Sequence, residues 1–157
     1  MTARDMSAKE LLELYAAGER DFSRLDLPGI RLEGANLRNA NFRETDLSDA
    51  GLDWASLSYS DFGHANLSGA RLGEVDLVEA NLEGADLSKI VCGQTGFFEA
   101  NLSHANLKGA ILTETSFDDA NLSYADFSGT KNFDIHHRCK GAIFNETIMP
   151  DGTIRNS

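Results

Sequence analysis

A large apolar residue recurs at every fifth position of this chain from Phe22 to Phe127. Of those 22 positions, 15 are Leu, six are Phe and one is Cys92. Two positions before each, from residue 35 to residue 125, 13 of 19 residues are Ala. The other six are Thr45, Ser60, Val75, Ile90, Thr95 and Thr115. So strict a period determines the architecture, because few backbone paths can bury the same two side chains every five residues.

A period of five fits neither regular element of secondary structure. In an α-helix, five residues advance about 140° beyond a full turn, so the Leu positions would spread around the helix. In a continuous strand, an odd period would send successive Leu side chains to opposite faces. The pattern instead predicts a chain that points two side chains inward, turns a corner and repeats, which winds it into an all-β solenoid.

The spacing of the core Phe residues predicts four corners in each coil. Phe22, Phe42 and Phe62 lie 20 residues apart, and so do Phe97 and Phe117. Coils of four pentapeptides would stack these rings about 4.8 Å apart, with each corner turning by roughly 90°. Each coil would bury four Leu or Phe side chains, each contributing roughly 1.5–3 kcal/mol before entropy is subtracted, which is enough for an independent fold.

The repeated A-[N/D]-L-x-x motif, over roughly residues 20–130, resembles the pentapeptide-repeat family. The resemblance implies a right-handed quadrilateral β-helix, here of about five to six coils. It implies less about function: most members have none assigned, some resemble DNA and protect type II topoisomerases from drugs, and others are regulatory. The topoisomerase-protecting members often carry loops that project from the coil, whereas this repeat runs from Ala35 to about Thr130 without an inserted loop.

The chain is predicted to form one structural domain in three parts: a capping helix (1–18), the solenoid (19–130) and a loop with a C-terminal cap (131–157). Ser7 and Glu10 form a capping box, and Gly18 is a typical helix stop, so residues 8–17 are predicted to be helical. The apolar stripe of this helix is assigned to Ala8, Leu11, Leu12, Tyr15 and Ala16. We expect the helix to cover the open edge of the first coil.

Residues 131–141 break the register of the repeat. The small-x-large pattern resumes at residues 142–144 and 147–149 with an offset of two, and the turn signal at residues 150–152 ends the solenoid. Phe144, Ile148 and Met149 are expected near an exposed end. The predicted oligomeric state is therefore a monomer or an end-to-end homodimer.

The two cysteines and the N-terminal residues indicate the compartment. Cys92 occupies an inward position and Cys139 lies in a distant loop, so both are expected to be reduced. Residues 1–5 contain no apolar run, which predicts no signal peptide, and no stretch approaches 18 apolar residues, which predicts no membrane span. The predicted location is cytoplasmic.

Two groups of histidines are candidates for metal sites. His136, His137 and Cys139 lack a fourth ligand and the usual zinc spacing, so we interpret them as part of a solvated basic loop. His64 and His104 would stand in one outward column two coils apart, about 9.6 Å, which is too far to share a metal. This column is interpreted as a surface ladder, in which Glu44 can pair with Arg24 and His64. No cofactor is predicted, and a tube filled by its own side chains leaves no cavity for catalysis.

Acidity is concentrated in the regular coils. Residues 1–43 carry seven acidic and seven basic side chains, whereas residues 44–126 carry fifteen acidic and three basic ones, a net charge of −12. This charge disfavours nucleic acid as a partner. Part of it is structural, because Asp and Asn before the large residue, such as Asp46, Asn66 and Asp86, suit hydrogen bonding to the corner backbone.

One corner of the predicted coil gathers exposed aromatic residues among carboxylates, a combination that can mark an interaction surface. This candidate protein-binding face consists of Tyr59, Val78, Glu79, Phe98, Glu99, Asp118 and Asp119. The alternative interpretation is ordinary solubilising charge on a rigid rod. The sequence thus predicts a non-enzymatic interaction scaffold or regulator that binds another protein. The alternative function is a DNA mimic that binds a type II topoisomerase or another nucleic-acid enzyme.

Overall fold

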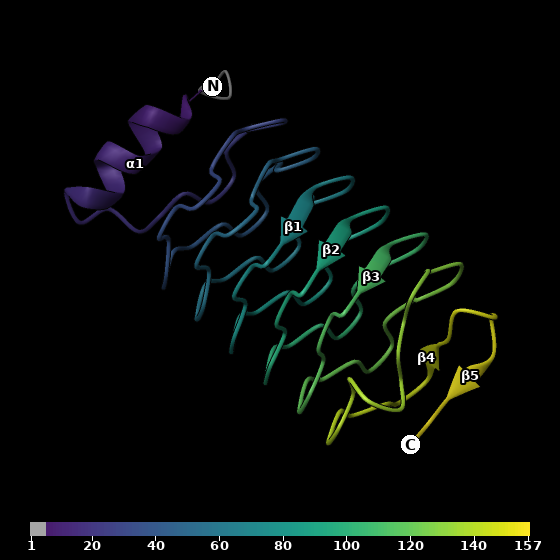
Figure 1. The fold of residues 1–157 in the computed structure, drawn as a ribbon. Coiled ribbons are helices and arrows are strands. Elements are labelled where there is room, and N and C mark those ends of the chain that lie inside the picture. Colours follow the sequence, from purple (N-terminus) through teal and green to yellow (C-terminus); the bar gives the residue numbers. More distant parts are fainter. Residues whose placement is uncertain (1–5) are drawn as a thin grey trace.

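The computed structural model describes residues 6–157. Its coils stack along one axis, with helix α1 at one end and the C-terminus near the other (Figure 1). Residues 1–5, on which the prediction about a signal peptide rests, lie outside the described residues. Among residues 6–157, no helix is long and apolar enough to cross a membrane.

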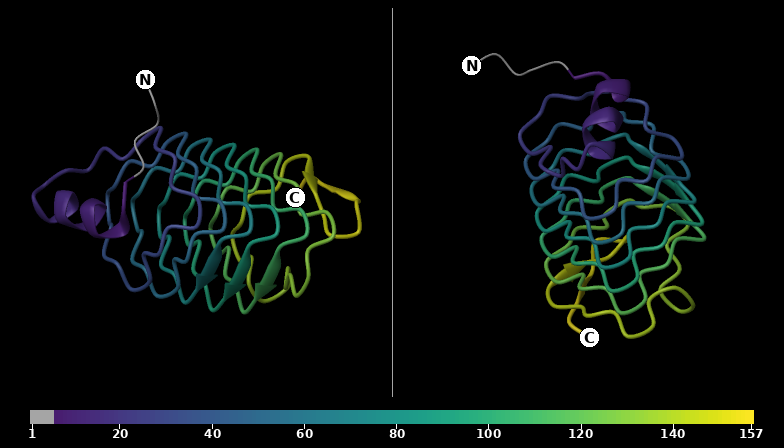
Figure 2. Two further views of the ribbon diagram at one scale, coloured as in Figure 1. Left: turned by 90° about the horizontal axis from the view of Figure 1, so that it is seen from above. Right: turned by 90° about the vertical axis from the view of Figure 1, so that its left-hand side faces the viewer.

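Each regular coil takes twenty residues. Parallel bridges join residues twenty apart, from Asp21 with Asn41 to Ile111 with Lys131. On one wall the rungs lengthen into strands β1 (Arg71–Gly73), β2 (Val91–Gly93) and β3 (Ile111–Thr113), which pair in parallel in the order β1-β2-β3. Two further views show the same succession of coils from the helix to the C-terminal segment (Figure 2). This is the four-pentapeptide register that the spacing of the Phe residues predicts.

The interior is filled by the repeated apolar residues. Every fifth residue from Phe22 to Phe127 is at most 3% exposed. The rings of Phe22 and Phe42 stack with their centroids 5.6 Å apart, Phe42 and Phe62 at 5.2 Å, and Phe97 and Phe117 at 5.1 Å. Aromatic columns therefore run along the axis of the solenoid, which couples each coil to the next.

The inward hydroxyl residues that replace Ala satisfy backbone carbonyls inside the tube. Thr45 Oγ1 donates to the carbonyl of Phe22 at 2.7 Å, and Ser60 Oγ donates to that of Leu37 at 2.9 Å. A buried hydroxyl without such a partner would be costly. These substitutions therefore fit the small inward position without disrupting the core.

The corners are tight turns whose second residue has a positive φ. The amide of Ala35 donates to the carbonyl of Leu32 at 3.1 Å, closing a turn in which Gly34 has a φ of 69°. The side chain of Asp46 stabilises the corner at residues 47–50. Its Oδ1 accepts a hydrogen bond from the amide of Ser48 at 2.9 Å and another from Asn66 Nδ2, one coil away, at 3.0 Å. The predicted structural role of Asp46 and Asn66 is thus confirmed.

Helix α1 (Ala8–Ala16) lies against the first coil, with Ser7 Oγ accepting from the amide of Glu10 at 3.2 Å. Leu11 is fully buried, and Leu14 and Tyr15 pack partly against the core. The assignment of Leu12 and Ala16 to the apolar stripe was wrong, since both are exposed, Leu12 by 38%. Residues three and four apart share a face of a helix, so Leu11 aligns with Leu14 and Tyr15 rather than with its immediate neighbour.

The C-terminal segment closes the other end with a short antiparallel pair, β4 (Thr147–Ile148) and β5 (Ile154–Arg155). Ile148 bridges Asp126, 22 residues earlier, which confirms the offset of two. Phe144, Ile148 and Met149 were expected near an exposed end, but Phe144 is covered and the other two are half-buried. The side chain of Phe144 is 7% exposed, and the Arg155 guanidinium lies 4.6 Å from its ring centroid. The chain turns back over its last coil, so β5 supplies the cover for this ring.

Candidate functional site

The seven residues of the predicted binding face meet at one corner of the solenoid. We call it the Tyr59 corner; it comprises the turn residues 58–59, 78–79, 98–99 and 118–119. Backbone hydrogen bonds of 2.9–3.1 Å connect successive turns: Tyr59 N donates to Val78 O, Glu79 N to Phe98 O and Glu99 N to Asp118 O. The ladder of a rigid solenoid therefore fixes the spacing of the exposed side chains along this corner.

The apolar part of the Tyr59 corner is accessible to solvent. Tyr59 is 46% exposed and Phe98 is 40% exposed, while Val78 between them is half-buried. Tyr59 has a φ of 63°, a backbone region that is unfavourable for residues with a β-carbon. Glu79 and Glu99 have the same backbone conformation in the next two coils, so the turn leaves the ring of Tyr59 on the outside of the corner.

Charge is distributed unevenly along this corner. Among residues 6–157, the carboxylates of Glu79 and Glu99 have no hydrogen-bond or ion-pair partner. At the N-terminal end of the corner, the Arg38 guanidinium lies 5.3 Å from the Tyr59 ring centroid and 3.9 Å from Asp76 Oδ2. The carboxylate of Glu79 therefore lies on the turn between the two exposed rings, and that of Glu99 follows directly after Phe98.

The C-terminal end of the Tyr59 corner is already engaged by the chain itself. Asp118 Oδ1 accepts from the amide of Lys140 at 2.8 Å, and the amide of Asp119 donates to the Lys140 carbonyl at 2.8 Å. These contacts attach residues 131–141 to the last regular coil. Asp118 holds this segment with its carboxylate and Asp119 holds it with its amide, while the side chain of Asp119 is exposed. We call the turns from Tyr59 to Glu99, which lie before this contact, the open part of the corner.

The outward histidine column forms a ladder of local contacts. Arg24 Nε lies 3.1 Å from Glu44 Oε2, and the hydrogen bond from Arg24 holds the pKa of Glu44 below its usual value. The His104 ring stacks on Tyr124 with their centroids 4.7 Å apart. Among residues 6–157, no group of three or more His, Cys, Asp and Glu side chains is arranged to hold a metal ion. The contacts in this column thus join surface side chains that lie one coil apart, an ion pair in one case and a ring stack in the other.

The loop around His136 and His137 differs from its prediction in one respect. His137 Nδ1 lies 3.0 Å from Asp134 Oδ2 at the surface, whereas Cys139 is only 8% exposed, with its Sγ 3.9 Å from the carbonyl of Asp134. The interpretation of Cys139 as part of a solvated loop was wrong, because the loop folds its thiol against the end of the core.

Both free thiols should therefore resist modification in the folded protein. Burial raises the pKa of Cys92 to about 12, and burial together with Asp118 and Asp134 raises that of Cys139 to about 12. The thiolate fraction at pH 8 is then about a thousandfold lower than for an exposed thiol. We expect Ellman's reagent to detect neither thiol in the native protein and both in denaturant. Rapid reaction of one thiol without denaturant would contradict the burial of that residue.

Sequence reasoning missed a second corner, which we call the Trp54 corner: the turn residues 53–54, 73–74, 93–94 and 113–114. A shallow groove of about 360 Å³ lies along it, lined by Trp54, Gly73, Glu74, Gly93 and Gln94. The indole of Trp54 is 61% exposed. The sequence contains one feature that could have indicated this groove. The single tryptophan of the chain stands at a corner position, and glycines follow it 19 and 39 residues later.

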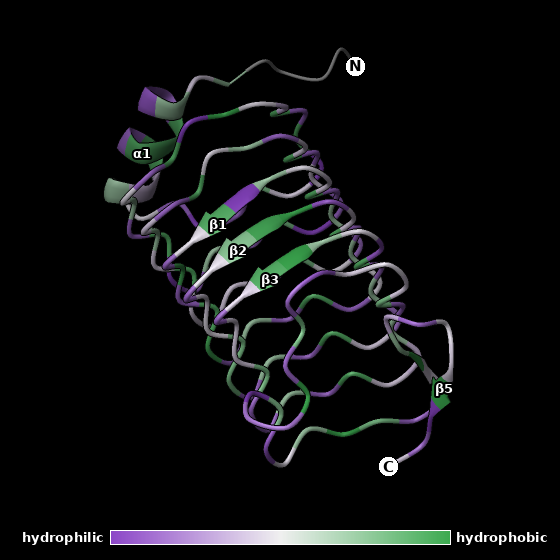
Figure 3. Cartoon of the chain, turned by 45° about the vertical axis from the view of Figure 1, so that its right-hand side comes forward, coloured by the Kyte–Doolittle hydropathy of each residue, from purple (hydrophilic) through white to green (hydrophobic). Residues whose placement is uncertain are grey.

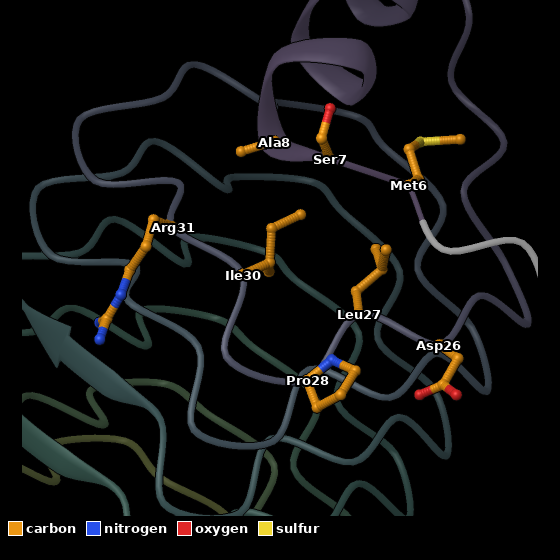
Figure 4. A pocket seen from close by; sticks show the side chains of 8 residues that line it. All are labelled: Met6, Ser7, Ala8, Asp26, Leu27, Pro28, Ile30 and Arg31. Carbon is orange, nitrogen blue, oxygen red and sulfur yellow. The ribbon is translucent and has the colours of Figure 1, made fainter.

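A further pocket, of about 420 Å³, lies where helix α1 meets the first coil (Figure 4). Leu27 and Ile30 point towards the start of the helix, while the charged ends of Asp26 and Arg31 point away from it. The junction is therefore apolar, as expected where a cap packs on the end of a solenoid.

Taken together, the stacked corners define a repeat solenoid that presents fixed columns of side chains on its outside. The family model for pentapeptide repeats matches in eight copies, over residues 21–53, 55–90 and 97–131. The chain belongs to the pentapeptide repeat family.

Solved structures of the same family resemble this chain. Alr5209, a pentapeptide repeat protein from Nostoc PCC 7120, is 29% identical with a TM-score of 0.56, over 87% of this chain and 93% of that one. HetL, a pentapeptide repeat protein involved in heterocyst differentiation regulation from the cyanobacterium Nostoc sp. strain PCC 7120, is 23% identical with a TM-score of 0.32, over 96% and 100%. QnrB1, a plasmid-mediated fluoroquinolone resistance protein, is 18% identical with a TM-score of 0.43, over 79% and 85%. No curated protein matches the sequence.

Proposed function

We propose that this chain is a non-enzymatic, cytoplasmic interaction scaffold or regulator that binds another protein through the open part of the Tyr59 corner. On this proposal it is a right-handed quadrilateral β-helix of about five to six coils, with α1 and the C-terminal segment as caps. The observation that carries the proposal is the pair of exposed rings, Tyr59 and Phe98, together with two unpaired carboxylates: that of Glu79, on the turn between them, and that of Glu99, directly after Phe98.

The residues of the Tyr59 corner are preorganised for binding. Binding to a mobile surface loses affinity to the ordering of loops and side chains, whereas here the ladder of backbone hydrogen bonds already fixes the spacing of the corner residues. Aromatic side chains are enriched among the residues that contribute most to protein interfaces. The negative charge between the two rings favours a partner with a basic surface and would accelerate its association at low salt.

Affinity capture with the wild type and with a Tyr59→Ser, Phe98→Ser double variant would test this proposal. We expect the double variant to lose specific partners that the wild type retains. Tyr124→Ser is a matched control, because Tyr124 is also 46% exposed but stands on another corner. Recovery of the same partners by the wild type and the double variant would show that the Tyr59 corner is not the binding face. Sedimentation of the same samples would distinguish a monomer from an end-to-end homodimer.

The charge of the coils supports a second candidate function, a DNA mimic that binds a type II topoisomerase or another nucleic-acid enzyme. Residues 44–126 carry a net charge of −12 on a rigid rod, which suits a basic channel. A supercoiling assay with a type II topoisomerase at low and moderate salt would test it. Because electrostatic attraction is greatest at low salt, the absence of any effect there would exclude this function for that enzyme.

A further inference from the structure

The groove at the Trp54 corner has features that the fold does not explain. Trp54 occupies the second position of its turn, with a φ of 63°, and the equivalent residue one coil earlier is Gly34, with a φ of 69°. Glycine takes this conformation most easily, but Glu74, Gln94 and Glu114 also take it in the following coils. The unusual feature of Trp54 is its side chain: it is the only tryptophan of the chain, and its indole is 61% exposed.

The floor of the groove is also unusual. A β-carbon on Gly73 would meet Asp53 Oδ1 at 2.8 Å, and the same oxygen accepts a hydrogen bond from the Gly73 amide. Close packing against Asp53 therefore explains why residue 73 is a glycine. No such contact explains the glycine at position 93, one coil further. Its φ lies outside the left-handed region, and a β-carbon there would meet nothing within 4 Å. The missing side chain at Gly93 therefore leaves open space in the groove, two coils along from the turn that carries Trp54.

The charges around the groove select its occupant. The Asp53 carboxylate, which is 6% exposed, is paired with Arg71 and with the Gly73 amide. Gln94 Nε2 donates to Glu114 Oε2 at 2.9 Å. Among residues 6–157, the carboxylate of Glu74 has no hydrogen-bond or ion-pair partner. An unpaired carboxylate and an exposed indole in one groove both attract a cation.

The wall next to the groove is apolar along β2 and β3, which favours a cation with an apolar stem, while Arg71 of β1 is paired with Asp53. Val91, the first residue of β2, is 45% exposed, and Ile111 follows it at the same position of β3. Both strands are coloured as hydrophobic over most of their length (Figure 3). An arginine side chain combines these properties: its planar guanidinium stacks on an aromatic face and donates to a carboxylate, and its methylene stem packs on apolar surface.

We propose that the Trp54 groove binds an arginine side chain of a partner protein. The guanidinium stacks on the indole of Trp54 and donates to the carboxylate of Glu74, while the stem lies in the space over Gly93. This site is separate from the Tyr59 corner, so it does not depend on the function proposed for that corner, and either proposal can fail without the other.

The single tryptophan makes the test direct, because its fluorescence and its indole N–H signal in NMR both report on the groove. We would titrate the folded protein with N-acetyl-arginine amide at millimolar concentrations and low salt. The matched probes are the citrulline analogue, which has the same shape without the charge, and N-acetyl-lysine amide. We expect a saturable shift with the arginine probe and binding at least about threefold weaker with the other two.

Three variants complete the test. Glu74→Gln should weaken binding of the arginine probe by about three- to tenfold, because it removes the charge but keeps the shape. Glu79→Gln at the Tyr59 corner should leave the affinity unchanged. Gly93→Leu should abolish binding by filling the groove, with the unfolding transition measured to confirm that the variant is folded. The absence of a saturable shift, equal binding of citrulline or lysine, or unchanged affinity in Glu74→Gln would each overturn the proposal.

Discussion

Replacing Phe117 by alanine should lower the free energy of unfolding by about 3–5 kcal/mol, the range expected for a buried aromatic residue. Phe117 is 1% exposed, and its ring stacks on Phe97 with their centroids 5.1 Å apart. It also meets the edges of Phe127 and Phe133, at 5.6 Å and 5.8 Å. The variant would therefore leave a cavity at the point where the last regular coil meets residues 131–141. Urea unfolding followed by circular dichroism would measure the change.

Phe98→Ala is the matched control for this experiment. Phe98 is the next residue after Phe97, yet it is 40% exposed, so its loss should change the free energy of unfolding by less than about 1 kcal/mol. Because each coil of a solenoid contacts only its neighbours, a local defect can also allow one end to unfold before the rest of the chain. A broadened or biphasic transition in Phe117→Ala would fit this coupling, whereas an unchanged midpoint would contradict the central role of its ring.

The architecture of this chain could be predicted because one physical constraint recurs in every coil. An inward Ala followed two residues later by an inward Leu or Phe permits only a chain that turns a corner every five residues. The same regularity predicted which residues would share the Tyr59 corner, since positions 20 apart lie directly above one another. Local rules that act through the backbone, such as the Asp46 hydrogen bond at its corner, were equally predictable.

The remaining features depend on contacts that do not repeat. Phe144 is covered because β5 folds back and places Arg155 over its ring, and no period in the sequence indicates that reversal. Cys139 is buried because an irregular loop folds over the end of the core. The Trp54 groove arises from the side chain that Gly93 lacks, and this absence becomes visible only when the neighbouring coils are in place.

Hydrogen bonds and ion pairs also distinguish the acidic residues on the outside of the solenoid from one another. Asp46 has a backbone partner and Asp118 holds the C-terminal segment, so their charges serve the fold. Glu74, Glu79 and Glu99 have no such partner among residues 6–157. All three stand on turns next to exposed aromatic side chains. Some of the acidic side chains of the coils therefore stabilise the fold, whereas Glu74, Glu79 and Glu99 have no partner that would explain them in this way.

Enlarging the inward Ala of a repeat should lower the free energy of unfolding, just as truncating the inward Leu or Phe should. Ala100 is 1% exposed, with Ala80 and Ala120 at the same position of the adjacent coils, about 4.8 Å away on either side. We expect Ala100→Leu to destabilise the protein by about 1–3 kcal/mol or more, because the added carbons can be accommodated only by moving a neighbouring coil.

Ala100→Ser distinguishes bulk from any disturbance of this site. Ser60 occupies the same inward column and donates to the carbonyl of Leu37, 23 residues earlier, at 2.9 Å. A serine at position 100 can donate in the same way to the carbonyl of Leu77, so its cost should stay below about 1 kcal/mol. Urea unfolding of both variants beside the wild type would measure the difference. If leucine proved as well tolerated as serine, the inward column would have free volume, and the close packing that fixes the surface corners of this solenoid would be refuted.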